Sequence, residues 1–404
     1  MRQDVLRGIR VVEVGTMWAA PYAARILADL GAEVIKVEGP RKPEPVRFGF
    51  YAANEAGETP WERGGHFQKF GRNKKSVIID LAQQRGRELL HALLAKSDVL
   101  IENNTPRVRE QLGLGHETLG RVAPNIIVVS MPGFGDTGPY RDYLAFGVNV
   151  EGFAGLTSVT GYPDGTDPIR SAIPYGDPVA ALYGAMTALL GLRGRRRGGG
   201  QRHFELSQHE GLASLLPDLL IEAQITGADP PRRGNADPVF SPLQGLFATG
   251  AGEWLALTLH EAEQIAWLCA LIGRPALGET RADSPELRTA IETWATATGR
   301  DEAVARLQAA GFAAAPVLAP SETMRHPQVV ARQVYAPVEH PISGPIPYSQ
   351  LPLRFAGAAS EPDIHAPLFG EHNRYVFGEI LGMSEDEIAG LYAAGITADA
   401  PNMS

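Results

Sequence analysis

The chain has 404 residues and a formal net charge of −9, and 44% of its residues are hydrophobic. This length and composition are typical of a globular protein with two or three domain-sized units. The acidic balance argues against a nucleic-acid-binding protein, because such proteins present basic surfaces to phosphates. No apolar run reaches the roughly eighteen residues of a membrane span, and the first ten residues lack the apolar core of a secretory signal. We therefore expect no membrane partner and a cytoplasmic location.

The sequence lacks the signatures of common metal and nucleotide sites. Its single cysteine, Cys269, is spaced with Leu268 and Ile272 as on one face of a helix, so we interpret it as a core residue. The ten histidines do not occur at the spacing of metal ligands. Neither a phosphate-binding loop nor a serine-nucleophile motif is present. We therefore predict no bound metal.

The first third of the chain alternates short β-branched runs with amphipathic helical stretches, the pattern of a parallel sheet with crossover helices. The expected strands are residues 11–14, 34–37, 99–102 and 125–130, and the expected helices are residues 21–30 and 84–95. This order predicts a doubly wound α/β sheet. The turn after Gly15 lacks the further glycines of a nicotinamide-binding fingerprint, which disfavours a dehydrogenase.

The second half of the chain has a different pattern. Residues 206–240 contain the run DPPRRG, which indicates a linker. Beyond it, the sequence predicts a smaller α+β domain with two strands at 246–259 and helices at 261–272, 285–298 and 301–310. Ser284 is the expected N-cap of the middle helix. A proline-rich stretch then leads to expected helices near 371–381 and 385–393, the last one opened by a capping box of Ser384 and Glu387.

Asp177 directly precedes a helix that we expect from about Pro178 to Leu192. An aspartate before a proline is an ordinary N-cap, which satisfies backbone N–H groups at the helix start. The same position also suits a nucleophile, because the helix dipole keeps a carboxylate ionised. Gly176 leaves space for a substrate to approach the backbone. The residues alone favour the cap, and the two roles are compatible.

Several longer motifs follow one another along the chain. They are GIRVVEVG at 8–15, GRNKKSVIIDL at 71–81, SDVLIENNTPRVREQLGLG at 97–115, NIIVVSMPGFGDTGPYRDY at 125–143, YGDPVAALYG at 175–184 and GEHNRYVFGEILGMS at 370–384. In this order they resemble the CaiB/BaiF group, the family III CoA-transferases, over essentially the whole chain. The resemblance implies a Rossmann-like large domain built from both chain ends, a smaller domain between them and an interlocked dimer. The expected ranges are 1–205 for the first part of the large domain, 206–240 for the linker, 241–320 for the small domain and 321–404 for the returning segment.

The resemblance also implies the reaction. Enzymes of this family move coenzyme A from an acyl-CoA donor to a carboxylic acid through a covalent intermediate on an aspartate, which falls here on Asp177. The motifs look most like the branch that uses succinyl-CoA with benzylsuccinate or related dicarboxylates. By analogy, residues 234–242 would help exclude water from the site, although many relatives have glycines where this chain has DPVFSP.

The resemblance places the CoA contacts on several separate segments. The matching residues are Thr16, Met17, Trp18, Arg41, Lys42, Arg72, Asn73, Lys74, Lys75 and Asn103, with Arg109 added. The cations at 72–75 suit the ADP phosphates. Gly39 and Gln111 stand where relatives usually have arginines, and we expect Arg41 and Arg109 to substitute for them.

Two other functions remain as alternatives. The racemase branch of the family uses a histidine at the position of Phe146, and phenylalanine cannot serve as the second base of a proton shuttle. A racemase or isomerase is therefore disfavoured. A non-catalytic CoA-binding subunit is opposed by the intact Asp177. We expect a homodimer, and a heteromer with a paralogue stays open.

Overall fold

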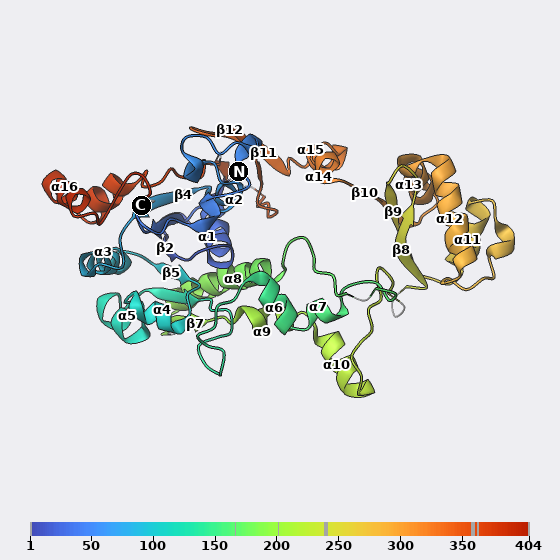
Figure 1. Cartoon of the computed structure of the whole chain (residues 1–404), viewed down its shortest axis with the longest axis horizontal. Helices are drawn as coiled ribbons and strands as arrows, with labels where there is room; N and C mark the ends of the chain where they lie inside the picture. Colours follow the sequence, from blue (N-terminus) through green and yellow to red (C-terminus); the bar gives the residue numbers. More distant parts are fainter. Residues whose placement is uncertain are drawn as a thin grey trace. The chain divides into compact units, whose positions relative to one another are not determined.

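Figure 1 presents a computed structural model of the chain, which describes residues 2–165, 167–200, 202–237, 241–356, 360–361 and 363–402. It divides into two compact units. The first comprises Met1–Leu156, Ser171–Ile221 and Gln333–Ser404, and the second comprises Thr157–Arg170 and Glu222–Arg332. Residues 157–170, which the sequence suggested for the large domain, belong to the second unit because Arg232 donates hydrogen bonds to the carbonyls of Ser158 and Gly165.

The first unit contains a six-stranded parallel sheet in the order β4-β3-β2-β5-β6-β7. Its strands are β2 (Arg10–Val14), β3 (Glu33–Glu38), β4 (Lys74–Ile78), β5 (Val99–Glu102), β6 (Ile127–Ser130) and β7 (His203–Glu205). Val12 of β2 pairs with Ile35 of β3 on one side and with Leu100 of β5 on the other. The predicted α/β class and its four strands are confirmed, and the order of the strands reverses between β2 and β5. β4 and β7 were not predicted.

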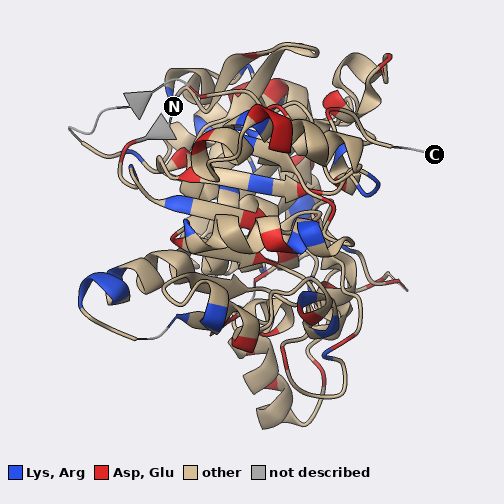
Figure 2. Cartoon of the chain, turned by 90° about the vertical axis from the view of Figure 1, so that its left-hand side faces the viewer, with Lys and Arg blue, Asp and Glu red and all other residues tan. Residues whose placement is uncertain are grey.

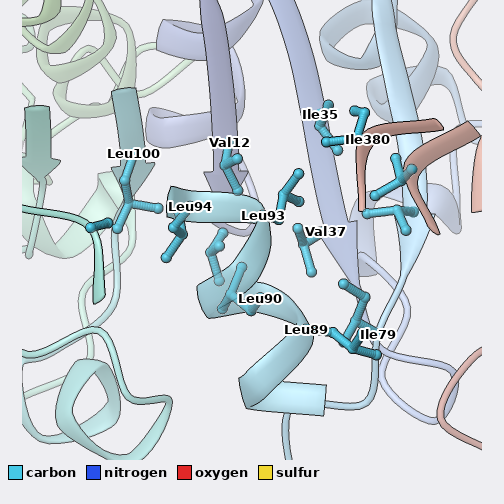
Figure 3. Packing of buried hydrophobic residues seen from close by; sticks show 14 of the residues in the cluster. Val12, Ile35, Val37, Ile79, Leu89, Leu90, Leu93, Leu94, Leu100 and Ile380 are labelled. Atoms are coloured by element: carbon cyan, nitrogen blue, oxygen red, sulfur yellow. The ribbon is translucent and has the colours of Figure 1, made fainter. Parts of the chain in front are cut away.

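Helices cover both faces of this sheet. On one face, Leu89, Leu90, Leu93 and Leu94 of α3 (Gln84–Ala95) pack against Val12, Ile35, Val37 and Leu100 of the strands (Figure 3). On the other face, α1 (Ala19–Asp29) packs against α8 (Gly176–Arg196) through small residues. A Cβ on Gly184 of α8 would come within 3.3 Å of the Ala23 Cβ of α1, so the glycine permits this close approach. The remaining helices before α8 are α2 (Gly65–Gly71), α4 (Pro106–Gln111), α5 (His116–Val122), α6 (Gly147–Phe153) and α7 (Leu156–Val159).

The segment expected to be a linker begins with helices. α9 (Gln208–Ala213) and α10 (Pro217–Thr226) occupy much of residues 206–240, where the sequence indicated a linker and no helix was predicted. Ser207 caps α9, because its side chain accepts a hydrogen bond from the Glu210 N–H. Pro238–Phe240, at the end of the expected linker and within the DPVFSP segment, lie outside the described residues.

The C-terminal segment belongs to the first unit. It contributes the hairpin of β11 (Tyr335–His340) and β12 (Gly344–Ser349), a π-helix (Tyr375–Ile380) and α16 (Glu385–Ala393). The predicted capping box of α16 is confirmed by reciprocal hydrogen bonds between Ser384 and Glu387. Ile380 packs into the core on the α3 face of the sheet (Figure 3). At the other chain end, β1 (Arg2–Gln3) pairs with β13 (Ser360–Glu361).

The second unit is an α+β structure with its own core. Its antiparallel sheet has the order β10-β9-β8, formed by β8 (Leu243–Ala248), β9 (Trp254–Leu259) and β10 (Ala313–Val317). The helices are α11 (Gln264–Leu271), α12 (Pro285–Thr298), α13 (Arg300–Ala309), α14 (Pro320–Thr323) and α15 (Pro327–Ala331). Cys269 is fully buried in this core, and Ser284 caps α12 through the Leu287 N–H, as predicted. Within the described parts of both units, no helix has the length and apolar character needed to cross a bilayer.

Candidate active site

The turn after β2 lies at the point where the strand order reverses. In parallel α/β sheets, ligands bind in the crevice at the carboxyl ends of the strands at such a point. Thr16 in this turn and Asn103 after β5 are joined by two hydrogen bonds of 2.9 Å, from the Thr16 N–H to Asn103 Oδ1 and from Asn103 Nδ2 to the Thr16 carbonyl. A Cβ on Gly15 would lie 2.9 Å from Asn103 Oδ1, so glycine is needed here. Two of the predicted CoA contacts therefore meet, although they lie far apart in the sequence.

The basic segment at 72–75 mostly faces the protein interior. Arg72 is 1% exposed and its Nη2 lies 2.7 Å from Asp29 Oδ2, and Asn73 Nδ2 donates to Asp29 Oδ1 at 2.7 Å. Lys74 is 3% exposed, with its Nζ 2.6 Å from Glu13 Oε2. The expectation that this whole stretch of cations faces phosphates does not fit these side chains, because their charges are neutralised internally. Lys75 remains partly exposed, with its Nζ over the Tyr375 ring.

The remaining predicted cations lie nearer the surface. Arg41 is largely exposed and contacts Asp80 at 2.5 Å, and Lys42 is also exposed. Arg109 binds both carboxylate oxygens of Asp136, at 3.0 and 2.6 Å. Both arginines contact a carboxylate, but the Arg41 side chain is 59% exposed and that of Arg109 only 12%, so Arg41 is the better placed of the two expected substitutes to meet a ligand. Among the described residues, no cluster of three histidine, cysteine or acidic side chains is arranged to hold a metal ion.

Asp177 lies inside the first turn of α8. The helix begins at Gly176 and its N-cap is Tyr175, which makes no side-chain capping bond, so the interpretation of Asp177 as the N-cap was wrong. The Asp177 carboxylate accepts no hydrogen bond from any residue that the structure describes. It packs against the bare Cα of Gly147, where an added Cβ would lie 2.4 Å from Asp177 Oδ2. The carboxylate is therefore held by packing, and its oxygen lone pairs have no partner in this part of the chain.

The surroundings of Asp177 disfavour its negative charge. Burial raises the pKa of Asp177 to about 6, and the nearby Glu151 carboxylate adds to this increase. Glu151 is 2% exposed and accepts a hydrogen bond of 2.7 Å from the Tyr175 N–H, which fixes the peptide just before α8. A carboxylate that is costly to ionise is also a stronger nucleophile once it is ionised, because it is poorly solvated.

Glu151→Gln should lower the pKa of Asp177, and with it the pH below which the activity expected from the family resemblance is lost. The substitution removes the like charge that raises the pKa of Asp177, while the amide oxygen can still accept from the Tyr175 N–H. The measurement is kcat/KM between pH 5 and 8. A profile identical to that of the wild type would contradict the electrostatic coupling of Glu151 to Asp177.

Sequence reasoning missed Gly147 and Glu151. Both lie on α6, in the segment AFGVNVEG, where the family resemblance draws attention only to Phe146. Phe146, at the position of the racemase histidine, is the N-cap residue of α6 and is 55% exposed. A single acidic residue within a short apolar helix was the available signal, because such a residue needs a local partner when it is buried.

Comparison with known proteins agrees with this geometry. The family model described as CoA-transferase family III matches residues 6–373. Succinyl-CoA–D-citramalate CoA-transferase of Chloroflexus aurantiacus is 33% identical over 401 residues, which cover 96% of this chain and 97% of that protein. The alpha subunit of succinyl-CoA–L-malate CoA-transferase from the same organism is 30% identical, over 95% of this chain and 90% of that subunit.

Comparison with solved structures indicates the same family. The crystal structure of a CaiB/BaiF family protein from Brucella suis matches with a TM-score of 0.83 and 27% sequence identity, covering 94% of this chain and all of the other. The match spans both units, and the sequence relatives align over nearly their whole length. The chain therefore belongs to CoA-transferase family III, the CaiB/BaiF family, and is a CoA-transferase.

Proposed function

We propose that this enzyme transfers CoA from succinyl-CoA to a dicarboxylic acid through a covalent intermediate on Asp177. The observation that carries the proposal is the state of the Asp177 carboxylate. It is half-buried at the start of a long helix and packs on Gly147, without a hydrogen bond from any described residue. A purely structural buried carboxylate would be hydrogen-bonded or paired, whereas a nucleophile needs a free lone pair.

The chemistry follows from a carboxylate meeting a thioester. Asp177 attacks the carbonyl of the acyl-CoA, which gives a mixed anhydride and the CoA thiolate. The thiolate attacks the aspartyl carbonyl, which gives an aspartyl-CoA thioester and releases the donor acid. The acceptor carboxylate then attacks this thioester, forming a second anhydride and thiolate. Attack of the thiolate on the acceptor carbonyl yields the new acyl-CoA and restores Asp177.

Placement of CoA at the carboxyl edge of the sheet is consistent with this mechanism. A helix that connects parallel strands runs back across the sheet, so both α1 and α8 begin at that edge. Asp177 in α8 and the turn before α1 are therefore on the same side, and α1 packs directly against α8 (Figure 1). We propose that Thr16, Met17, Trp18 and Asn103 contact CoA there, with Arg41 and Lys42 as the exposed cations for its phosphates. Lys75 is only partly exposed and lies near the start of β4 beside Glu33, toward the other edge of the sheet.

The substrate assignment rests on the relatives. The two described above are named for succinyl-CoA as donor and for D-citramalate or L-malate as acceptor, which are both dicarboxylic acids. Pocket residues decide such choices, so the acceptor is proposed only as a class. The exposed Phe146 beside the Asp177 site disfavours a racemase, because it supplies no base.

The oligomer is also a proposal. Leu182, Met186 and Leu190 on α8 are 60%, 48% and 55% exposed, which suits a helix face covered by a second chain. We propose the interlocked homodimer of the family. A heteromer with a paralogue is the alternative, and one relative is named as an alpha subunit.

The test is intact-mass analysis of the chain, expressed alone, after incubation with succinyl-CoA. We expect a CoA adduct, which hydroxylamine converts to a hydroxamate that peptide mapping locates at Asp177. Asp177→Ala should form no adduct. An adduct formed by the single gene product would also favour the homomer. CoA binding without any adduct, across a panel of acyl-CoA thioesters, would overturn the proposal in favour of a binding subunit or an isomerase.

A further inference from the structure

Four charged side chains are buried beneath the turn after β2. Glu13 on β2, Lys36 on β3, Glu44 after β3 and Lys74 on β4 are each at most 3% exposed, and we call them the buried tetrad. They alternate in charge along a chain of contacts. Lys74 Nζ lies 2.6 Å from Glu13 Oε2, Glu13 Oε1 lies 2.8 Å from Lys36 Nζ, and Lys36 Nζ lies 2.7 Å from Glu44 Oε2. Figure 2 shows charges of both signs on the strands of this sheet.

The tetrad also binds the backbone of the turn. Glu44 Oε1 accepts a hydrogen bond of 2.8 Å from the Met17 N–H, and Lys36 Nζ donates to the Gly15 carbonyl at 3.0 Å. Lys74 Nζ donates to the Pro21 carbonyl in the first turn of α1 at 2.7 Å. Met17 itself has a φ of 66°, which a residue with a side chain adopts only where neighbours hold it. The buried tetrad therefore holds the Met17 N–H and the carbonyl groups of Gly15 and Pro21, which lie on either side of Met17 in the sequence.

Electrostatics favour the charged forms of Glu13 and Lys36 at the centre of the tetrad, whereas at its two ends burial outweighs the opposite charges and lowers the pKa of Lys74 to about 8. Burial alone would raise the pKa of Glu13, but the ammonium groups of Lys36 and Lys74 outweigh it and hold this pKa below its usual range. Burial would lower the pKa of Lys36, but Glu13 and Glu44 raise it well above its ordinary value. Burial raises the pKa of Glu44, which the Lys36 ammonium opposes. Lys36 uses all three of its N–H donors, on Glu13, Glu44 and the Gly15 carbonyl.

Stability alone does not explain such an arrangement. Burying ions costs about as much as their mutual attraction returns, and well-packed apolar residues of similar volume are often equally stable. What apolar residues cannot supply is directional contact with the Met17 N–H and the Gly15 carbonyl. We infer that Lys36 and Glu44 are positioning residues, which hold the turn at Thr16–Trp18 in the conformation that binds CoA. This inference rests on the proposed role of the turn. It also gives Lys74 a supporting role beneath the turn in place of a phosphate contact.

The experiment measures CoA affinity and stability in the same variants of the full chain. Glu44→Gln should raise the Kd of CoA, measured by calorimetry, by about tenfold, because the amide has a single acceptor oxygen and cannot bind both the Met17 N–H and the Lys36 ammonium. It should raise the KM for succinyl-CoA similarly while kcat at saturation stays within about threefold, since uniform binding is what is lost. Its melting temperature should fall.

Two further variants separate positioning from stability. Lys36→Met/Glu44→Leu removes one charge of each sign and leaves Glu13 paired with Lys74, so it should melt near the wild type yet bind CoA about tenfold more weakly. Glu62→Gln weakens the buried contact of Glu62 with Arg47 at 3.2 Å, a pair that makes no hydrogen bond to the described residues of the turn, and should lower the melting temperature without changing the Kd of CoA.

Each outcome has a definite meaning. A folded double variant that binds CoA with the wild-type Kd would overturn the inference, as would a Glu62→Gln variant that weakens CoA binding as much as Glu44→Gln does. Failure of the wild type to bind CoA would instead refute the proposed function, so the two failures are distinguishable.

Discussion

Asp177→Asn should abolish acyl transfer and also make the folded protein more stable at neutral and alkaline pH. The amide cannot attack a thioester, so we expect kcat to fall by at least about 10³-fold. The gain in stability has an electrostatic origin. The pKa of Asp177 is raised from 3.8 to about 6 in the folded protein by burial and by Glu151.

The pH dependence of this gain has a defined sign. Below pH 3.8 the carboxyl is protonated in both the folded and the unfolded chain, and it contributes no charge to either. As pH rises from 3.8 to about 6, the unfolded chain loses this proton while the folded chain retains it, so the stability of the folded chain decreases, and the loss is complete above about 6. Allowing for solvent screening at a partly exposed group, the cost that Asn removes above pH 7 is about 1–2 kcal/mol.

Thermal unfolding of the wild type and of Asp177→Asn at pH 5 and pH 8 tests the predicted gain in stability. The melting temperature of Asp177→Asn should exceed that of the wild type by about 2–4 °C at pH 8 and by less at pH 5. Asp229→Asn, at an exposed position in the second unit, is the matched control and should show no such difference. A variant that is less stable than the wild type at pH 8 would show that Asp177 is a structural carboxylate. Mass spectrometry must exclude deamidation back to aspartate.

The large sheet was predictable because its central strands are buried on both faces. The runs at 11–14 and 99–102 are nearly continuous in β-branched and apolar residues, and each became a strand at the expected place. β4 was missed because it begins with Lys74 and Lys75, and nothing local reveals that Glu13 compensates the buried Lys74. The sequence near 335–349 looked irregular because of its prolines, but a two-stranded hairpin tolerates proline on its outer edges.

The helices within the expected linker could have been predicted. Ser207 and Glu210 have the spacing of a capping box, and the run DPPRRG that suggested a linker begins only after α10 ends. The proline and glycine composition of that run applies to residues 229–234 and not to the helical residues before them. The middle segment of the first unit ends within α10, at Ile221.

The candidate site also contains some residues that the sequence identifies and others that only the structure reveals. Asp177 and the turn with Asn103 were identified because the resemblance marks them in the sequence. Glu44, Gly147 and Glu151 act through contacts with residues 24 to 30 positions away, such as the 2.8 Å bond from the Met17 N–H to Glu44. No local pattern encodes such contacts. The roles expected for Arg72 and Lys74 changed for the same reason, since exposure is a tertiary property.

Gly147→Ala should reduce the rate of acyl transfer by about 10²-fold with little loss of stability. The added Cβ would lie 2.4 Å from Asp177 Oδ2 and 2.5 Å from the Pro174 Cβ, so the carboxylate or the segment before α8 must move. Gly147 has no left-handed φ, and the substitution therefore adds no backbone strain. Because the substitution displaces the Asp177 carboxylate and leaves the turn at Thr16–Trp18 unchanged, kcat should fall by a larger factor than the affinity for CoA. Single-turnover formation of the Asp177 adduct measures the displaced step directly.

Gly152→Ala is the matched control, because Gly152 lies on the same short helix and an added Cβ there meets nothing within 4 Å. It should keep wild-type activity and stabilise α6 by up to about 1 kcal/mol through the higher helix propensity of alanine. The pair therefore separates the effect of a methyl group on α6 from its effect on the carboxylate. If Gly147→Ala formed the adduct at the wild-type rate, the carboxylate would have to react from a position other than the one against Gly147. The packing of Asp177 on that glycine would then have no part in catalysis.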